Sequence, residues 1–129
     1  MDSLCTLSAT RLAALIRERR VTASEVVAAH IAKVRAVNPA INALVVDRFD
    51  AALAEARAAD ARVAAEPPDS LPPFLGVPCS IKEAFALTGM PQTSGLLARR
   101  GRLCTSDAVT VARLRAAGAI PLGVTHTSE

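Results

Sequence analysis

Residues 75–85 read LGVPCSIKEAF, and this stretch decides how the second half of the chain folds. A Gly-Val-Pro turn precedes an apolar run that predicts a β-strand and its exit over residues 79–85. Farther along, residues 107–117 predict a helix followed by Gly118, and residues 119–124 predict a buried strand. A strand, a crossover helix and a second strand form a βαβ unit, so we expect an α/β fold whose sheet is at least partly parallel.

Between these two predicted strands lies a long stretch without periodicity, from about residue 87 to residue 105. It contains a Gly-Met-Pro turn at residues 89–91 and a Ser-Gly pair at residues 94–95. Loops longer than about 12 to 15 residues inside a compact chain usually carry function or indicate a misread element. Both interpretations stay open for this loop.

Two helices are predicted at the start of the chain. Leu12, Leu15 and Ile16 are spaced as on one face of a helix. Residues 22–25, Thr-Ala-Ser-Glu, match the capping box that begins a helix, and the apolar stripe of this second helix ends at Asn38-Pro39.

A strand and a third helix follow. A short β-branched segment at residues 41–46 predicts the strand, and an alanine-rich helix runs from about residue 48 to residue 65. Residues 67–73 hold prolines that predict a stiff, extended connector, because each proline fixes φ and removes a donor. We therefore expect one unit with a helical part at residues 1–66, this connector, and a βαβ segment at residues 74–129.

The composition excludes several classes of function. A chain of 129 residues that is 51% hydrophobic and 21% charged is typical of one folded domain. The net charge is +3, but the basic residues alternate with acidic ones and stacking aromatics are scarce, so we expect no nucleic-acid partner. No apolar run is long enough to span a bilayer and no signal peptide is visible, so we expect a cytoplasmic protein without a membrane span. The oligomeric state stays open.

The sequence predicts no metal and no cofactor. The cysteines and histidines lie far apart in the sequence: Cys5, Cys79, Cys104, His30 and His126. They form no C-x-x-C pair and no usual metal-ligand spacing, and an odd number of cysteines predicts no disulfide framework. The chain has no G-x-G-x-x-G motif, and residues 118–125, GAIPLGVT, lack the lysine of a phosphate-binding loop.

Lys82 is the residue that the chemistry singles out, because its neighbours in the predicted strand are apolar. Alternation places Ser80 and Lys82 on one face and Cys79 and Ile81 on the other. Lysine is rarely buried unless it is paired or chemically employed, and burial favours the neutral amine, which is a competent base. The functional interpretation therefore requires a side chain shielded from water. The alternative is a structural lysine that extends from the strand end to Glu83 or to solvent.

Several segments resemble, in order and spacing, the motifs of one enzyme family. The first is the turn and strand already quoted, where Gly-Val-Pro precedes a lysine and an acidic residue; the others are residues 89–95, 107–119 and 123–129. On these motifs and on its opening helices, the chain resembles the amidase signature family. Within it, the chain is most similar to fatty-acid-amide-hydrolase-like members at residues 82–85, 89–91, 94–96 and 99–100.

This resemblance implies both a fold and a reaction. The fold is the N-terminal portion of an amidase signature fold, with N-terminal helices followed by a βαβ unit of a mixed sheet, as an incomplete domain. The reaction is hydrolysis of the carbon–nitrogen bond of a small-molecule amide by a Ser–cis-Ser–Lys triad. Lys82 matches the family lysine, which takes a proton through the bridging serine and so activates the nucleophilic serine.

Two features depart from the family pattern. His126 stands where the family usually has asparagine, which is expected to change local geometry near the site. The glycine- and serine-rich signature, which carries both serines and the oxyanion hole, has no counterpart in these 129 residues. We therefore expect the chain to be a fragment that carries only the lysine and is inactive alone. An incomplete sheet exposes strand edges, so we also expect the isolated chain to aggregate or to be partly molten.

Two other interpretations stay open. The glutamine amidotransferase subunit that amidates misacylated tRNA, a glutamyl-tRNA amidotransferase A-subunit-like protein, shares the same motifs, and no feature of the sequence excludes it. A non-catalytic interaction module would explain the absent serines, and a sharp cooperative unfolding transition of a monomer would favour it.

Overall fold

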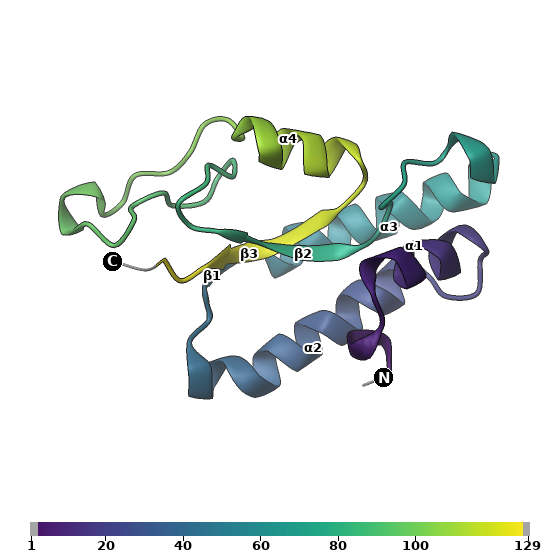
Figure 1. The fold of residues 1–129 in the computed structure, drawn as a ribbon, viewed down its shortest axis with the longest axis horizontal. Coiled ribbons are helices and arrows are strands. Elements are labelled where there is room, and N and C mark those ends of the chain that lie inside the picture. The colour runs from purple at the N-terminus through teal and green to yellow at the C-terminus, as the bar shows by residue number, and fades with distance from the viewer. Residues whose placement is uncertain (1–2, 128–129) are drawn as a thin grey trace.

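The computed structural model describes residues 3–127, and within them four α-helices and a three-stranded sheet form a mixed α/β fold (Figure 1). The strands are β1 (Leu44–Asp47), β2 (Pro78–Lys82) and β3 (Ile120–Thr125), in the order β1-β3-β2. β2 and β3 are parallel, whereas β1 is antiparallel to β3. The predicted βαβ unit and the mixed sheet are confirmed.

The helices cover both faces of this sheet. They are α1 (Ala9–Arg17), α2 (Ala23–Ile41), α3 (Phe49–Ala65) and α4 (Val109–Ala116). α4 lies on one side of the sheet, and α1, α2 and α3 lie on the other (Figure 1).

α2 begins where the capping box predicts and runs farther than predicted. The backbone N–H of Glu25 donates to Thr22 Oγ1 at 3.0 Å, and the backbone N–H of Thr22 donates to Glu25 Oε2 at 2.8 Å. The helix continues through Pro39 to Ile41, because a proline in the last turn removes only one hydrogen bond. Asn42 then ends it in a left-handed conformation. The next strand accordingly starts later than predicted.

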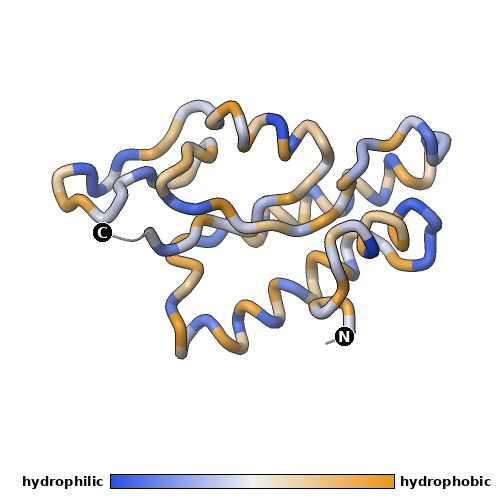
Figure 2. Tube along the Cα trace, in the orientation of Figure 1, coloured by the Kyte–Doolittle hydropathy of each residue, from blue (hydrophilic) through white to orange (hydrophobic). Residues whose placement is uncertain are grey.

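Apolar side chains form two cores, one on each face of the sheet. The larger core joins α1, α2 and α3 to the sheet, and the smaller one lies under α4. Buried members of the larger core include Leu12, Ile16, Val27, Phe49, Ala56 and Leu122. The smaller core consists of Ile81, Leu87, Val111 and Val124 with partly buried neighbours. The hydropathy trace shows hydrophobic stretches along the central strands, between the helices (Figure 2).

An irregularity in β3 changes the face that its side chains cover. Ile120 and Leu122 contribute to the larger core, but Val124, two residues on, belongs to the smaller one. The register with β2 shifts within this segment, as in a β-bulge. Gly123 lies so close to β1 that an added Cβ would overlap the carbonyl oxygen of Val46, so only glycine fits there.

A chain of charged side chains joins α3, α4 and the sheet. Glu55 Oε1 lies 2.8 Å from Arg48 Nη2 and 2.9 Å from Arg115 Nη2. Arg115 Nη1 lies 3.2 Å from Asp107 Oδ2. Arg48 also donates to the carbonyl oxygen of Pro121 at 2.7 Å. Burial raises the pKa of Glu55, but the hydrogen bonds and the positive charges of Arg48 and Arg115 lower it by a larger amount. The net pKa of Glu55 therefore lies below the ordinary value.

The two irregular segments differ from their predictions in detail. The proline-rich connector contains a 3-10 turn at Pro68–Ser70, where the hydroxyl of Ser70 donates to the carbonyl oxygen of Pro67 at 2.8 Å, so the connector is not extended throughout. The long stretch from residue 87 to residue 105 is a loop that contains the 3-10 turn Leu97–Arg99 and one bridge between Pro91 and Leu103. α4 starts later than predicted, at Val109.

Candidate active site

Lys82 is the last residue of β2, where the chain leaves the sheet. Its register partner is Thr125, the last residue of the parallel strand β3, and the backbone N–H of Glu83 donates to the carbonyl oxygen of Thr125 at 3.0 Å. Lys82 and Ser80 are exposed whereas Ile81 is buried, which confirms the predicted alternation. Ligand sites of open α/β sheets lie outside the carboxyl ends of their strands, and Lys82 stands at such an end.

The expectation that Lys82 is shielded from water within this chain is wrong. Its side chain is exposed. The physical reason is topological: β2 is an outer strand of the described sheet, and Lys82 is the last residue of this strand and alternates with the buried Ile81. The structural alternative, a lysine that extends to solvent, describes its position in these 129 residues.

Glu83, the next residue, is buried and is only 5% exposed. Its carboxylate accepts hydrogen bonds from the backbone N–H of Thr93 at 2.9 Å, from the backbone N–H of Ser94 at 2.8 Å and from the hydroxyl of Thr93. Ser94 has a positive φ of 51°, as does Gly95 at 79°, so the chain turns sharply there. Glu83 therefore holds the Thr93–Gly95 turn next to the end of β2, where Lys82 lies.

The electrostatics of Glu83 follow from these contacts. Burial raises the pKa of its carboxyl group, but the hydrogen bonds from Thr93 and Ser94 stabilise the carboxylate and lower the pKa more. The net pKa lies below the ordinary value, so Glu83 is ionised at neutral pH.

Further hydrogen bonds hold the loop that follows. Gln92 Nε2 donates to the carbonyl oxygen of Ala84 at 2.8 Å. The backbone N–H of Gly89 donates to the carbonyl oxygen of Cys104 at 2.8 Å, and the N–H of Cys104 donates to the carbonyl oxygen of Met90 at 2.9 Å. Polar contacts thus tie the loop to the strand end and to itself.

Asp107 anchors the other end of the same loop. It accepts hydrogen bonds from the backbone N–H and the hydroxyl of Thr88, each at 2.8 Å. The Thr88 N–H is the main cause that holds the pKa of Asp107 below its ordinary value, and Arg115 lowers it further. Asp107 therefore connects the loop to the charged chain that joins α3 and α4.

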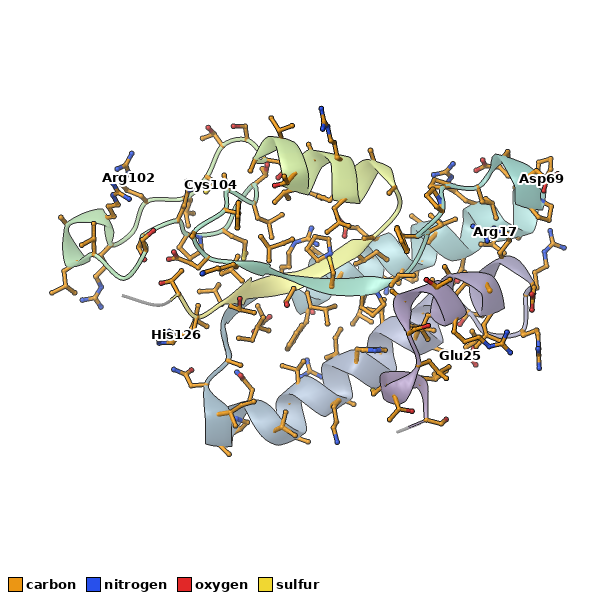
Figure 3. All side chains as sticks on the ribbon, in the orientation of Figure 1. Arg17, Glu25, Asp69, Arg102, Cys104 and His126 are labelled. Carbon is orange, nitrogen blue, oxygen red and sulfur yellow. The ribbon has the colours of Figure 1, made fainter. Side chains whose placement is uncertain are left out.

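His126 lies directly after β3 (Figure 3). Because Lys82 pairs with Thr125, His126 follows the same carboxyl end of the parallel strands. Its backbone N–H donates to the carbonyl oxygen of Ala43 at 2.8 Å, its side chain is exposed, and Nδ1 lies 2.8 Å from the carbonyl oxygen of Thr127. The effect of histidine in place of the family asparagine stays a prediction. Ser128 and Glu129, which complete this motif, lie outside the described residues.

The cysteines are free thiols. Burial raises the pKa of Cys79 to about 11, so this thiol is protonated at neutral pH and is a poor nucleophile. Within residues 3–127, no group of three or more histidine, cysteine, aspartate or glutamate side chains is arranged to hold a metal ion. In the same part of the chain, no helix has the length and apolar character needed to cross a bilayer.

Sequence reasoning missed Glu83 as a site residue and treated it only as a possible partner of Lys82. A signal was present: the alternation that places Ile81 inward also places Glu83 inward, two residues later. A buried carboxylate needs donors, and the loop provides them.

A model of the family described as Amidase matches residues 25–129, which include all three strands, Lys82 and Glu83. The chain belongs to the amidase family. Individual relatives also resemble the chain, in amino-acid sequence and in fold.

Fatty-acid amide hydrolase 2 of Homo sapiens is 47% identical over 133 residues, which cover 99% of this amidase chain and 25% of the relative. The A subunit of the glutamyl-tRNA(Gln) amidotransferase from Acidothermus cellulolyticus is 41% identical over 129 residues, covering 100% of this chain and 25% of the relative. The native peptide amidase from Stenotrophomonas maltophilia matches the fold with a TM-score of 0.81 at 27% identity, over 93% of this chain and 24% of that one. The amidase chain thus spans about a quarter of the length of these relatives. The predicted family is confirmed, and fatty-acid amide hydrolase 2 is among the relatives that the chain resembles.

Proposed function

We propose that residues 1–129 are the N-terminal part of an amidase domain that hydrolyses small-molecule amides by a Ser–cis-Ser–Lys mechanism, with Lys82 as its base. The observation that carries the proposal is the position of Lys82 at the carboxyl end of β2, inside the amidase match and next to the buried Glu83. In the proposed domain, the helical part at residues 1–66 and the connector at residues 67–73 support the βαβ segment at residues 74–129, which presents the lysine.

The proposed chemistry assigns one role to Lys82. The neutral amine takes a proton from a bridging serine, which in turn takes the proton of the nucleophilic serine, and that serine attacks the amide carbonyl carbon. The bridging serine then gives one proton to the nitrogen of the leaving amine and takes one back from the lysine, and water hydrolyses the acyl-enzyme to release the carboxylic acid and the free serine. Both serines belong to segments of a longer protein, so the 129-residue chain is proposed to have no hydrolase activity by itself.

The exposure of Lys82 defines what the rest of such a protein must provide. A neutral lysine amine requires a site with little water. β2 is the outer strand of the described sheet, and the unpaired backbone groups on its free side can pair with a further strand. We propose that a neighbouring segment of the full-length amidase covers this edge and removes water from Lys82, while Glu83 holds the loop beside it.

The test compares this chain with a longer reading frame that continues past Glu129 into a glycine-flanked serine pair. We expect no turnover of simple aryl amides by the 129-residue chain and measurable turnover by the longer protein. In the longer protein, Lys82→Ala should lower kcat/KM by about 10²- to 10⁴-fold, the usual contribution of a general base. Lys33→Ala is the matched control, because Lys33 is the other lysine of the chain and is exposed on α2, and it should change kcat/KM by less than about twofold.

Three outcomes would contradict parts of this proposal. Turnover by the 129-residue chain that disappears in Lys82→Ala would refute its inactivity. Full activity of Lys82→Ala in the longer protein would refute the role of the lysine. A longer protein with both serines that hydrolyses no amide would remove the proposed reaction.

A second candidate within the family is a role in tRNA-dependent amidation. The observation that favours it is the 41% identity to the amidotransferase relative from Acidothermus cellulolyticus over the whole chain. The two candidates differ in their partners, because an amidotransferase subunit functions in a complex. Co-purification of the longer protein with partner subunits would favour this candidate, and amide hydrolysis by the longer protein alone would favour the first.

A further inference from the structure

A hollow of about 410 Å³ lies between the start and the end of the long loop that follows β2. Its polar lining comes from Gln92, Arg99, Arg102, Thr105 and Ser106. Lys82 is not among the lining residues, so the hollow is separate from the proposed catalytic lysine. Arg102 lies on the part of the loop that extends beyond the sheet (Figure 3).

The charge of this hollow is positive and unbalanced. No acidic residue of the described chain lines it, and Arg100 adds a third guanidinium to the same short segment. Among residues 3–127, no ion pair involves Arg99, Arg100 or Arg102. The acidic residues that border the loop have other partners, as described above. An anion bound beside guanidinium groups that have no acidic partner is favoured electrostatically.

The hollow also offers neutral donors. Thr105 and Ser106 also line the hollow, are exposed, and carry hydroxyl groups that can donate hydrogen bonds to an anion. Each arginine presents a planar fork of N–H donors that suits the oxygens of an oxyanion. Two forks and two hydroxyl groups provide more donors than the two oxygens of a carboxylate can use, whereas a phosphate group offers more oxygens and a higher charge.

We infer that this hollow is a binding site for a phosphate group, held by Arg99 and Arg102 with help from Thr105 and Ser106. The phosphate belongs to a small phosphorylated molecule or to a lipid headgroup. The second source is included because Leu96, Leu97 and Leu103, which flank the arginines, are 53%, 84% and 62% exposed. Figure 2 shows hydrophobic and hydrophilic residues next to each other at this end of the molecule.

The test uses hydrogen–deuterium exchange of the longer protein that continues past Glu129, at low concentration and in the presence of glycerol 3-phosphate. We expect saturable protection of residues 99–106 and at least tenfold weaker binding of acetate. The double variant Arg99→Gln/Arg102→Gln should bind glycerol 3-phosphate at least tenfold more weakly. The control is Arg11→Gln/Arg57→Gln, which removes the same charge from exposed positions on α1 and α3 and should bind like the wild type.

A second measurement separates the two sources of phosphate. Vesicles of phosphatidylglycerol are compared with vesicles of phosphatidylcholine. Arginine-dependent binding to phosphatidylglycerol vesicles without binding of glycerol 3-phosphate assigns the site to a lipid headgroup, and the reverse assigns it to a small molecule. The inference is overturned if neither probe binds saturably, if acetate binds as well as the phosphate, or if the control variant loses binding as much as the double variant does. None of these results depends on amide hydrolysis, so the proposed function is tested separately.

Discussion

The helical layer and the loop after β2 are held in place by different forces. In the helical layer, Ile16, Val26 and Val27 are almost fully buried, and the alanines Ala52 and Ala56 let α3 pack closely against its neighbours. The loop, in contrast, exposes large apolar side chains and is fixed by polar contacts to Glu83 and Asp107. Loops positioned by a rigid scaffold are the usual carriers of binding and catalysis. Apolar burial therefore stabilises the helical layer, whereas hydrogen bonds to two carboxylates hold the loop.

The largest effect is expected from a substitution in the hydrophobic core of the helical layer. Ile16→Ala removes a side chain that is 1% exposed in the larger core. In the longer protein that continues past Glu129, the variant should lower the free energy of unfolding by about 2 to 5 kcal/mol, because it loses apolar burial and leaves a cavity. Urea denaturation followed by circular dichroism, at micromolar concentration, measures the change. An unchanged free energy of unfolding would contradict the role of Ile16 in this core.

An intermediate effect is expected from removing the charge that holds the loop. Glu83→Gln keeps the shape of the side chain but replaces one acceptor oxygen with a donor that faces the N–H groups of Thr93 and Ser94. We expect faster amide exchange across residues 92–96 and a loss of about 1 to 3 kcal/mol of stability, the usual cost of unsatisfied buried groups. Glu18→Gln, at an exposed position after α1, is the control and should leave exchange in the loop unchanged.

The same contact predicts a pH dependence with a definite sign. Because the folded-state pKa of Glu83 is below the ordinary value of 4.5, its stabilising contribution is complete above that value and is lost as the pH falls through the lower folded-state pKa. The amide signals of Thr93 and Ser94 should shift in this acidic range in the wild type and stay constant in Glu83→Gln. Loop signals that titrate equally in both proteins would contradict the role of Glu83.

The smallest effect is expected in the exposed part of the loop. Leu97 is 84% exposed, so Leu97→Ser should change the free energy of unfolding by less than about 0.5 kcal/mol. It should, however, reduce aggregation of the isolated chain, because it removes an apolar side chain from the surface. Light scattering against protein concentration measures the second effect. A large loss of stability would show that Leu97 has a packing partner.

Local patterns in the sequence were sufficient to predict most helices and strands and to identify the family. Thr22 and Glu25 are neighbours on one helical turn, so their capping box can be identified from the order of residues alone. The alternation around Ile81 and Lys82 depends only on strand geometry, and the βαβ unit follows from the order of its elements. Each of these features involves residues that are close in the chain.

The sequence analysis missed features of two kinds: contacts between partners far apart in the chain, and local irregularities of the backbone. The link between Glu55 and Arg115 spans 60 positions, and no periodicity indicates it. The extension of α2 beyond Pro39 and the change of face at Val124 depend on local geometry that competes with simple rules. The buried state of Glu83 depends on donors in a loop whose path could not be predicted from a repeating pattern.

The amino-acid sequence by itself determined the amidase motifs, the mixed α/β fold and Lys82 as the candidate base, because spacing and order along the chain carry that information. Only the tertiary structure decided that Lys82 is exposed at an outer strand, that Glu83 is buried beneath the loop, and that arginines without an ion pair in the described chain surround a hollow. Exposure and charge pairing depend on which distant segments meet in space. That arrangement is a property of the packed molecule, and no short stretch of residues contains it.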